Sequence, residues 1–336
     1  FGIPSSVPST NPNMETTGGL IGVKETEELL KDPRFVCLGE VMNFKDMTSD
    51  HDTLIKKIIA ACRKARPTMP LEGHVPAYHS EDLAKVIYAG ITTDHTQQTS
   101  SLVDEKIRSG MFVEIQLKSM HQEVIDTVIE HGYFEHVALV TDDSMPDTLL
   151  KGHLNLLVKK AIDMGMRPED AIYISTYTPA RHMGLWDRGA IAPGRVADFI
   201  VLNNLEDLSI AQVYKNGLPF AAKDEKDNNV YPEELLHSVK APKLSEADFD
   251  LKTDLVQNGK VVANIIQINE VGTFTNHIQK CLEVKDGHVQ WKKAGLALML
   301  CQERYGKNEG RYAFALIDRG IVGDGAIGAT WAHDHH

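Results

Sequence analysis

Short apolar runs alternate with amphipathic segments over the first half of the chain. The runs are nearly continuous, as at residues 137–140, which is typical of strands buried on both faces. Between them, apolar residues recur at helical spacing, as from Leu54 to Cys62. Strands that alternate with helices in this way indicate a parallel βα sheet or barrel. The predicted strands are residues 35–40, 68–74, 90–95, 111–117 and 137–141.

The pattern changes after residue 143. Pro146 suits the first turn of a helix, and the residues behind it predict one long helix over 146–164. A second helix is predicted to begin at Pro168 and to run towards His182.

The last part of the chain predicts strands rather than a βα repeat. A turn leads into a strand at residues 189–202, and residues 209–217 predict a further strand that ends in a hairpin turn. Residues 222–250 are charged and contain prolines, which indicates a linker or a peripheral excursion. From residue 255 onwards strand-like runs alternate with turns, as expected of a separate domain.

Residues able to bind a metal occur where four of the predicted strands end. Glu40, His74 and His95 end three of the runs, and Asp142 follows a fourth. The carboxyl ends of barrel strands meet on one face, where active sites are built. Carboxylates and imidazoles are suitable ligands for a divalent metal. The pattern therefore predicts a metal site at one mouth of a barrel.

Each of these residues also has a purely structural interpretation. A single histidine at a strand end is more often a hydrogen-bonded structural residue, but His74 and His95 at successive ends favour a metal. Glu40 follows a buried run, where an unpaired charge would be costly. Asp142 and Asp143 could each cap the helix that follows them. We expect Asp142 at the metal as proton carrier and Asp143 as its support, and the reverse assignment stays open.

Two further residues are candidates for contact with a substrate or for support of the metal ligands. Glu72 lies two residues before His74, and His153 shares a predicted helical face with Leu149 and Leu157. Support of the barrel is the alternative for Glu72. A buried structural histidine is an equal alternative for His153.

Composition and charge exclude some classes of partner. The chain has 336 residues, of which 42% are hydrophobic and 24% charged, which suffices for a barrel and an appended domain. The net charge of −12 argues against nucleic acid or an anionic membrane as partner. No apolar run approaches the roughly 20 residues that cross a bilayer. The scattered cysteines favour reduced thiols and a cytoplasmic location: Cys37, Cys62, Cys281 and Cys301.

Two longer motifs narrow the class of protein. The sequence Pro-Ala-Arg-His-Met-Gly-Leu at residues 179–185 precedes a Gly- and Ala-rich turn and strand at residues 189–201. With the strand-end order Glu, His, His, Asp, this stretch resembles the amidohydrolase superfamily, whose members leave the barrel there and return to a small β-sandwich. Shorter motifs are similar to the bacterial adenine deaminase family, and they occur at residues 39–42, 72–76, 141–143, 152–153, 303–306 and 332–336.

This resemblance implies an α/β fold with an incomplete (β/α)8 barrel. About six of its strands would lie in residues 1–188, part of the β-sandwich in residues 189–221, and a partial C-terminal α+β domain in residues 222–336. The superfamily's His-x-His ligand pair does not occur near the start of this chain. We therefore expect the chain to be an internal segment of a longer enzyme, with that pair, two strands and half of the sandwich upstream.

The resemblance also implies hydrolytic deamination of adenine to hypoxanthine and ammonia. Glu40 would bridge two divalent metals, Mn²⁺ or Fe²⁺ with Zn²⁺ as the alternative, and His74 and His95 would bind one of them. Asp142 would act as general base and then as general acid, assisted by Asp143.

Two rivals stay open at this point. One is another amidohydrolase that acts on a cyclic amidine or amide, and the other is a catalytically incomplete fragment without metal. The expected partners are a nucleobase substrate and further copies of the chain in a homo-oligomer, with no nucleic acid and no membrane. His333 and His336 match a family motif, but a role for them, or an origin as a purification tag, is left open.

Overall fold

The computed structural model describes residues 1–8, 19–144, 146–220, 230–241, 243–270, 275–303, 305–306, 312–320, 323 and 325–328. These residues form two compact units, one within residues 1–220 and the other within residues 230–328. The predicted boundary at residue 222 falls outside the described residues and stays a prediction.

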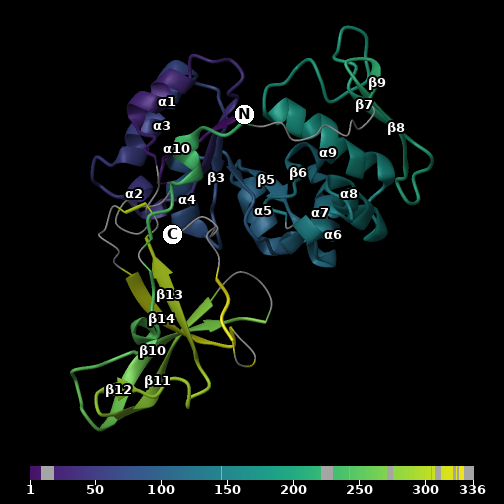
Figure 1. The fold of residues 1–336 in the computed structure, drawn as a ribbon. Coiled ribbons are helices and arrows are strands. Elements are labelled where there is room, and N and C mark those ends of the chain that lie inside the picture. Colours follow the sequence, from purple (N-terminus) through teal and green to yellow (C-terminus); the bar gives the residue numbers. More distant parts are fainter. Residues whose placement is uncertain are drawn as a thin grey trace. The chain divides into compact units, whose positions relative to one another are not determined.

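Six parallel strands form the framework of the first unit (Figure 1). They are β1 (Gly2–Ile3), β2 (Cys37–Val41), β3 (Leu71–Gly73), β4 (Thr93–Asp94), β5 (Phe112–Ile115) and β6 (Val137–Leu139). They pair in the orders β1-β2-β3 and β4-β5-β6. The backbone N–H of Thr92 donates to the carbonyl of Leu71 at 2.9 Å and joins the two sets. The prediction of an incomplete (β/α)8-type barrel with about six strands is confirmed.

Helices connect the strands and cover them. Between β1 and β6 these are α1 (Val23–Leu29), α2 (Phe44–Thr48), α3 (Leu54–Ala65), α4 (Ser80–Tyr88), α5 (Ser100–Arg108) and α6 (Gln122–His131). Two short 3-10 helices, η1 (Leu117–Ser119) and η2 (Tyr133–Glu135), follow β5 and α6. Behind β6 lie α7 (Pro146–Leu149), α8 (Leu154–Asp163) and α9 (Pro168–His182).

The prediction of one helix over residues 146–164 is wrong. The chain leaves the helix between α7 and α8, where Gly152 has a φ of 147°, far from helical values. A Cβ at this position would lie 2.8 Å from the Leu156 side chain, so only glycine fits the break. The second predicted helix, which begins at Pro168, is confirmed.

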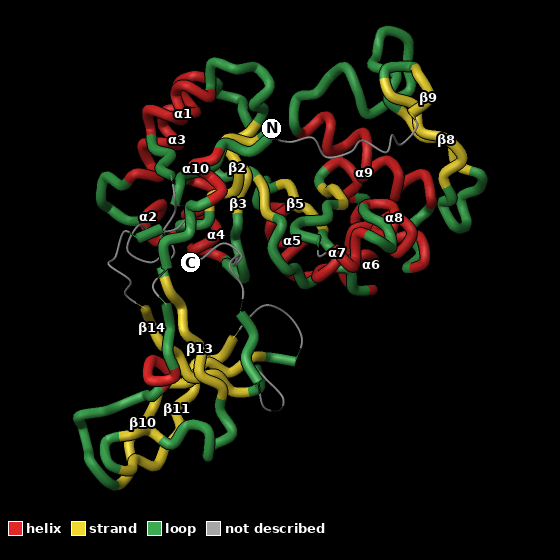
Figure 2. Tube along the Cα trace, viewed as in Figure 1, coloured by secondary structure: helices red, strands yellow, loops and turns green. Residues whose placement is uncertain are grey.

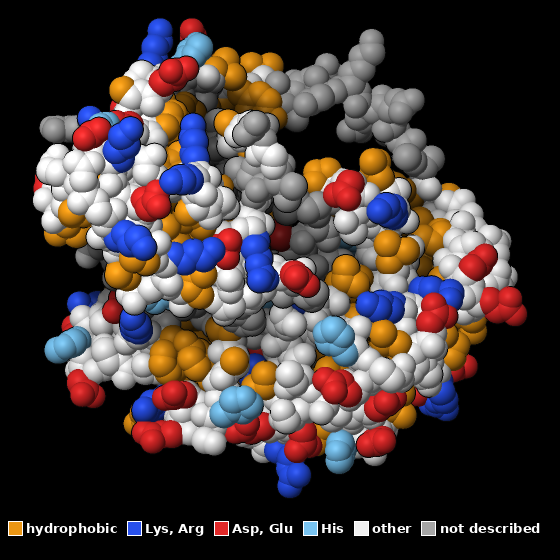
Figure 3. Space-filling view, turned by 90° about the horizontal axis from the view of Figure 1, so that it is seen from below, with side chains coloured by type: hydrophobic (Ala, Val, Ile, Leu, Met, Phe, Trp, Pro, Cys, Tyr) orange, Lys and Arg blue, Asp and Glu red, His pale blue; other side chains and the backbone are white. Residues whose placement is uncertain are grey.

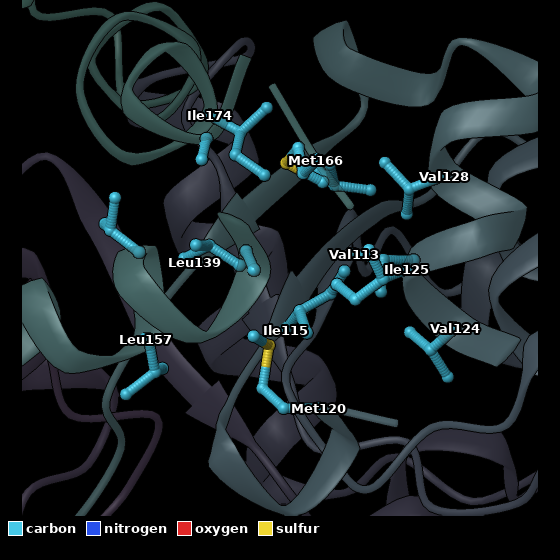
Figure 4. Close-up of a cluster of buried hydrophobic side chains, with 14 of the residues drawn as sticks. Val113, Ile115, Met120, Val124, Ile125, Val128, Leu139, Leu157, Met166 and Ile174 are labelled. Atoms are coloured by element: carbon cyan, nitrogen blue, oxygen red, sulfur yellow. The ribbon is translucent and has the colours of Figure 1, made fainter. Parts of the chain in front are cut away.

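Apolar side chains from the strands and helices fill the space between them. The face of α3 that the sequence predicted to be apolar is buried, with Ile58 and Cys62 fully so. A second cluster lies between β5, β6 and the helices around them, where Ile115, Val128 and Ile174 are inaccessible to solvent (Figure 4). Full burial of each such side chain contributes about 1.5–3 kcal/mol, which holds the strand ends in fixed positions.

A small antiparallel sheet follows α9. It consists of β7 (Phe199–Leu202), β8 (Ile210–Lys215) and β9 (Leu218–Phe220). Asn216 and Gly217 form the predicted hairpin turn between β8 and β9 with φ values of 51° and 77°, as Asn-Gly turns require. Apolar side chains of this sheet remain exposed, for example Leu218 at 71%.

The second unit is mainly β-sheet, as the strand-like runs predicted (Figure 2). Two short helices, α10 (Glu233–Leu236) and η3 (Glu246–Phe249), precede the strands. The strands are β10 (Gly259–Ile268), β11 (Thr275–Lys285), β12 (His288–Val289), β13 (Ala297–Gln302) and β14 (Tyr312–Asp318), in the order β12-β11-β10-β14-β13. One face holds a separate core around Ile265, Leu282 and Leu316.

Basic and acidic side chains are interspersed on the face drawn in Figure 3. No helix within the described part of the chain is long and apolar enough to cross a membrane. All four cysteines are free, with Cys37 and Cys62 buried and Cys281 and Cys301 exposed.

Candidate metal centre

Glu40, His74 and His95 come together at the carboxyl ends of β2, β3 and β4. Oε2 of Glu40 lies 3.0 Å from Nδ1 of His74 and 2.8 Å from Nε2 of His95. The two imidazole rings meet edge to face, with their centroids 5.2 Å apart. One potential ligand atom from each residue lies within 4.8 Å of the other two.

The parallel strands explain this convergence. Glu40 lies within β2, whereas His74 and His95 directly follow β3 and β4, so all three reach the same edge of the framework. Gly73 lets β3 and β4 approach closely at this point. A Cβ on Gly73 would lie 2.6 Å from the carbonyl oxygen of Thr93, a clash that would push His74 away from His95.

The three side chains form one electrostatic unit. Burial alone would raise the pKa of Glu40, but hydrogen bonds with His74 and His95 outweigh it and hold that pKa far below its usual range. Burial would lower the pKa of His95, yet the hydrogen bond and negative charge of Glu40 raise it to about 9. The site is thus arranged to place positive charge against the Glu40 carboxylate.

The donor set fits a divalent metal. One carboxylate oxygen and two imidazole nitrogens are ligands that Zn²⁺, Mn²⁺ and Fe²⁺ accept. The side chains of His74 and Glu40 are 36% and 33% exposed, and that of His95 is 15% exposed, so an ion can reach the group. These observations support Glu40, His74 and His95 as the predicted metal ligands.

Asp142 does not belong to this group of described residues. It lies in the loop behind β6, with a left-handed backbone of φ 55°. Its Oδ1 accepts a hydrogen bond of 2.7 Å from the backbone N–H of Asp143, and its Oδ2 lies 4.0 Å from Nζ of Lys118. The roles expected of Asp142 and Asp143 in catalysis stay predictions.

Glu72 is buried and belongs to a polar cluster that the sequence analysis only partly found. Its Oε2 accepts a hydrogen bond of 2.7 Å from Thr93, and its Oε1 lies 3.5 Å from Nε2 of His182. Burial, and next the charge of Glu72, raise the pKa of Glu114 to about 8. Neither His182 nor Glu114 is among the site residues predicted from the sequence. Glu114 had a signal, because it is the one charged residue in the apolar run at residues 111–117.

His153 is exposed and caps α8 rather than lying inside a helix. The alternative of a buried structural histidine is therefore wrong, and the reason is the break at Gly152. Its backbone N–H donates to Oδ1 of Asn155 at 2.8 Å. A contact with substrate remains a prediction for both His153 and Glu72. His333 and His336 lie outside the described residues.

Comparison with known proteins shows which protein families the chain is similar to. Residues 22–220 match the model of the amidohydrolase family, and residues 272–336 match that of the adenine deaminase C-terminal domain. The whole chain is 54% identical to adenine deaminase 2 of Oenococcus oeni and covers 59% of it. It is 44% identical over 343 aligned residues to an adenine deaminase of Clostridium perfringens and covers 60% of that protein.

Among solved structures, the chain is similar to a β-aspartyl dipeptidase from Fervidobacterium islandicum AW-1. The sequence identity is 19%, the TM-score is 0.48, and the match covers 65% of each chain.

Proposed function

The chain belongs to the amidohydrolase family, and we propose that it forms part of an adenine deaminase, which hydrolyses adenine to hypoxanthine and ammonia. The observation that carries this proposal is the convergence of Glu40, His74 and His95 at successive strand ends. It occurs in a chain that is 54% identical over its whole length to a protein named adenine deaminase 2. Because the chain spans 59% of that relative, the activity is proposed for the longer protein.

We propose that Glu40 bridges two divalent metals and that His74 and His95 bind one of them. Mn²⁺ or Fe²⁺ is the expected ion, and Zn²⁺ is the alternative that the same donors accept. When bound, the metals would supply Lewis acidity and lower the pKa of water towards ~7. Without such help neither water nor C6 of a purine is reactive enough at neutral pH.

The proton transfers are assigned to Asp142. Its carboxylate would accept a proton from water as the water oxygen adds to C6 of adenine. The resulting acid would then deliver that proton towards the ring or the departing amino group, so that ammonia leaves. The parallel pairing of β6 with β5 supports this assignment, because the loop of Asp142 follows the same end of its strand as His74 and His95 do. Asp143 would hold the loop.

Three further expectations complete the proposal. The substrate is a small molecule, and we place the enzyme in the cytoplasm, where its free cysteines would stay reduced. We also expect a homo-oligomer, which light scattering of the full-length protein would measure.

The test is a substrate panel on the full-length protein. The protein is stripped of metal, reloaded with Mn²⁺, and assayed for ammonia release from adenine, adenosine, cytosine and a cyclic amide such as hydantoin. We expect metal-dependent release from adenine, with hypoxanthine as the product. Metal-dependent turnover of cytosine or hydantoin but not adenine would replace the proposed substrate. Failure to bind metal would overturn the proposal as a whole.

A further inference from the structure

A buried ion pair lies directly beneath the candidate metal centre. Nζ of Lys106, on α5, lies 2.6 Å from Oδ2 of Asp94, the last residue of β4, and both side chains are 0% exposed. We propose that Lys106 is a positioning residue, which fixes the separation of His74 and His95 by tying together the backbone beside each of them. This inference rests on the proposed metal site.

On the His95 side, Asp94 and Lys106 organise the loop that carries the imidazole. Asp94 directly precedes His95, and its carboxylate accepts hydrogen bonds from the backbone N–H of Thr96 at 3.2 Å and from its hydroxyl at 2.8 Å. Nζ of Lys106 also donates a hydrogen bond of 3.1 Å to Oε1 of the Gln98 side-chain amide. Both neighbours of His95 in the chain are therefore held by the ion pair.

On the His74 side, the same two side chains hold Val75, the residue that directly follows His74. Its backbone N–H donates to Oδ1 of Asp94 at 2.7 Å, and its carbonyl accepts from Nζ of Lys106 at 3.0 Å. Both polar backbone groups of Val75 thus bind the pair. Val75 itself is 1% exposed, so water cannot replace either bond.

Neighbouring contacts fix α5, from which Lys106 reaches the site. Glu105, the residue before Lys106, accepts a hydrogen bond of 2.7 Å from the backbone N–H of Ser80 and lies 2.6 Å from Nδ1 of His79. The loop between β3 and α4 is therefore tied to α5 at two points. The ammonium group of Lys106 cannot move without moving the backbone on both sides of the candidate metal centre.

A purely structural role of Lys106 would have a different consequence for metal binding. A buried ion pair often contributes little net stability compared with apolar residues of similar volume. If Lys106 only filled the core, its removal would lower stability but leave the metal affinity of the folded protein unchanged. If it positions the histidines, metal affinity falls even where the protein remains folded, because the two imidazoles no longer meet one ion.

The experiment compares three variants of the full-length protein after metal removal. Lys106→Met keeps the length of the side chain and removes the charge. Gln98→Met removes only the amide that bridges Asp94 and Lys106, and is the milder variant. Val128→Ala is the matched control, because Val128 is fully buried on α6 and none of its atoms hydrogen-bonds the ion pair. Stability is followed by Tm and metal binding by titration with Co²⁺, whose visible spectrum reports ligand geometry.

We expect Lys106→Met to weaken Co²⁺ binding by about 10–100-fold, the range for losing a partner that orients metal ligands, and to change the visible spectrum. Gln98→Met should weaken binding in the same direction by less. Val128→Ala should lower Tm and leave the affinity and spectrum as in the unchanged protein.

Unchanged affinity and spectrum in folded Lys106→Met would overturn the inference. If Lys106→Met fails to fold, Gln98→Met decides, and wild-type binding in that variant overturns it equally. If the unchanged protein binds no Co²⁺, the proposed metal site fails instead, so the two failures are distinguishable.

Discussion

Two lysine–aspartate pairs lie near barrel-strand ends, and they differ in almost every physical respect. Lys106 and Asp94 are 2.6 Å apart and fully buried at the end of β4. Lys118 and Asp142 are 4.0 Å apart in the region behind β5 and β6, with side chains 46% and 24% exposed. The first pair makes hydrogen bonds to the backbone of both Val75 and Thr96. In the second pair, Oδ1 of Asp142 accepts one hydrogen bond, from the backbone N–H of the adjacent Asp143.

This difference distinguishes the rigid surroundings of His74 and His95 from the loop of Asp142, which is held less firmly. Around His74 and His95 the buried pair leaves no freedom, because each of its polar atoms has a fixed partner. An exposed ion pair contributes about 0–1 kcal/mol, which is too little to hold the loop of Asp142 against another ligand. We infer that the histidines are preorganised for a metal, and that Asp142, if it is the proton carrier proposed above, takes its working position only when metal and substrate bind.

The largest effect is expected from the residue that joins the two imidazoles. If Glu40 is shared by two metal ions as proposed, Glu40→Gln would replace its carboxylate with a neutral amide, which would compensate less for the repulsion between the two cations. In the full-length protein we expect metal affinity to fall by more than the ~100-fold typical of lost orienting partners, and turnover to fall with it. Elemental analysis after dialysis measures the metal content, and full occupancy in the variant would show that Glu40 does not bridge.

The next prediction concerns Asp142 and Asp143 in the loop behind β6. If Asp142 is the proton carrier, Asp142→Asn should reduce turnover by at least ~100-fold while metal content and Tm stay nearly unchanged. Asp143→Asn should reduce turnover less and lower Tm more, because its expected task is to hold the loop.

Turnover and Tm of both variants, measured in the same full-length protein, decide between the two aspartates. An inactive Asp143→Asn beside an active Asp142→Asn would invert the assignment. Equal and complete loss in both would mean that the loop acts as one unit.

A third prediction concerns Glu114, the buried carboxyl group that interacts with Glu72. Glu114 has its pKa raised from 4.5 to about 8, so the folded state holds a proton that the unfolded state releases between these values. The unfolded state then binds fewer protons, and the free energy of unfolding must fall as pH rises from about 4.5 to about 8. The stabilisation is complete below the lower value and is lost as the pH rises towards the upper one.

Glu114→Gln should flatten this dependence, because the amide does not titrate. Urea unfolding of the metal-free protein at pH 5 and pH 8 measures it, with Glu123→Gln on the exposed face of α6 as control. A slope as steep in Glu114→Gln as in the control would show that another group holds the proton.

The convergence of Glu40, His74 and His95 could be predicted from the sequence, because it depends on local patterns. Glu40, His74 and His95 end short apolar runs, and parallel pairing brings such ends to one edge whatever the details of packing. The break between α7 and α8 was not predicted, because the apolar spacing on both sides of Gly152 favours one continuous helix. Its φ of 147° shows that the break is a local feature.

The hydrogen-bond network of Lys106 and Asp94 could not be predicted from local sequence patterns. Lys106 lies in a helix whose other charged residues, such as Asp104 and Arg108, form a pair at the surface, and nothing in its neighbours distinguishes it from them. Its burial results from contacts with Val75 and Asp94, residues 31 and 12 positions away in the chain. Such burial is a property of the assembled strands and becomes visible only in three dimensions.

The smallest effect is expected at the exposed pair. Lys118→Met removes the ammonium group that lies 4.0 Å from Asp142, a partly exposed contact that is screened by solvent and salt. We expect the free energy of unfolding to change by less than about 1 kcal/mol. The same substitution at Lys106 leaves a buried carboxylate without its partner and should cost about 3–5 kcal/mol. Urea unfolding of both variants measures the contrast directly. Comparable losses would mean that the loop behind β6 is held as firmly as the histidines, and Asp142 would then have to act from the position it occupies here.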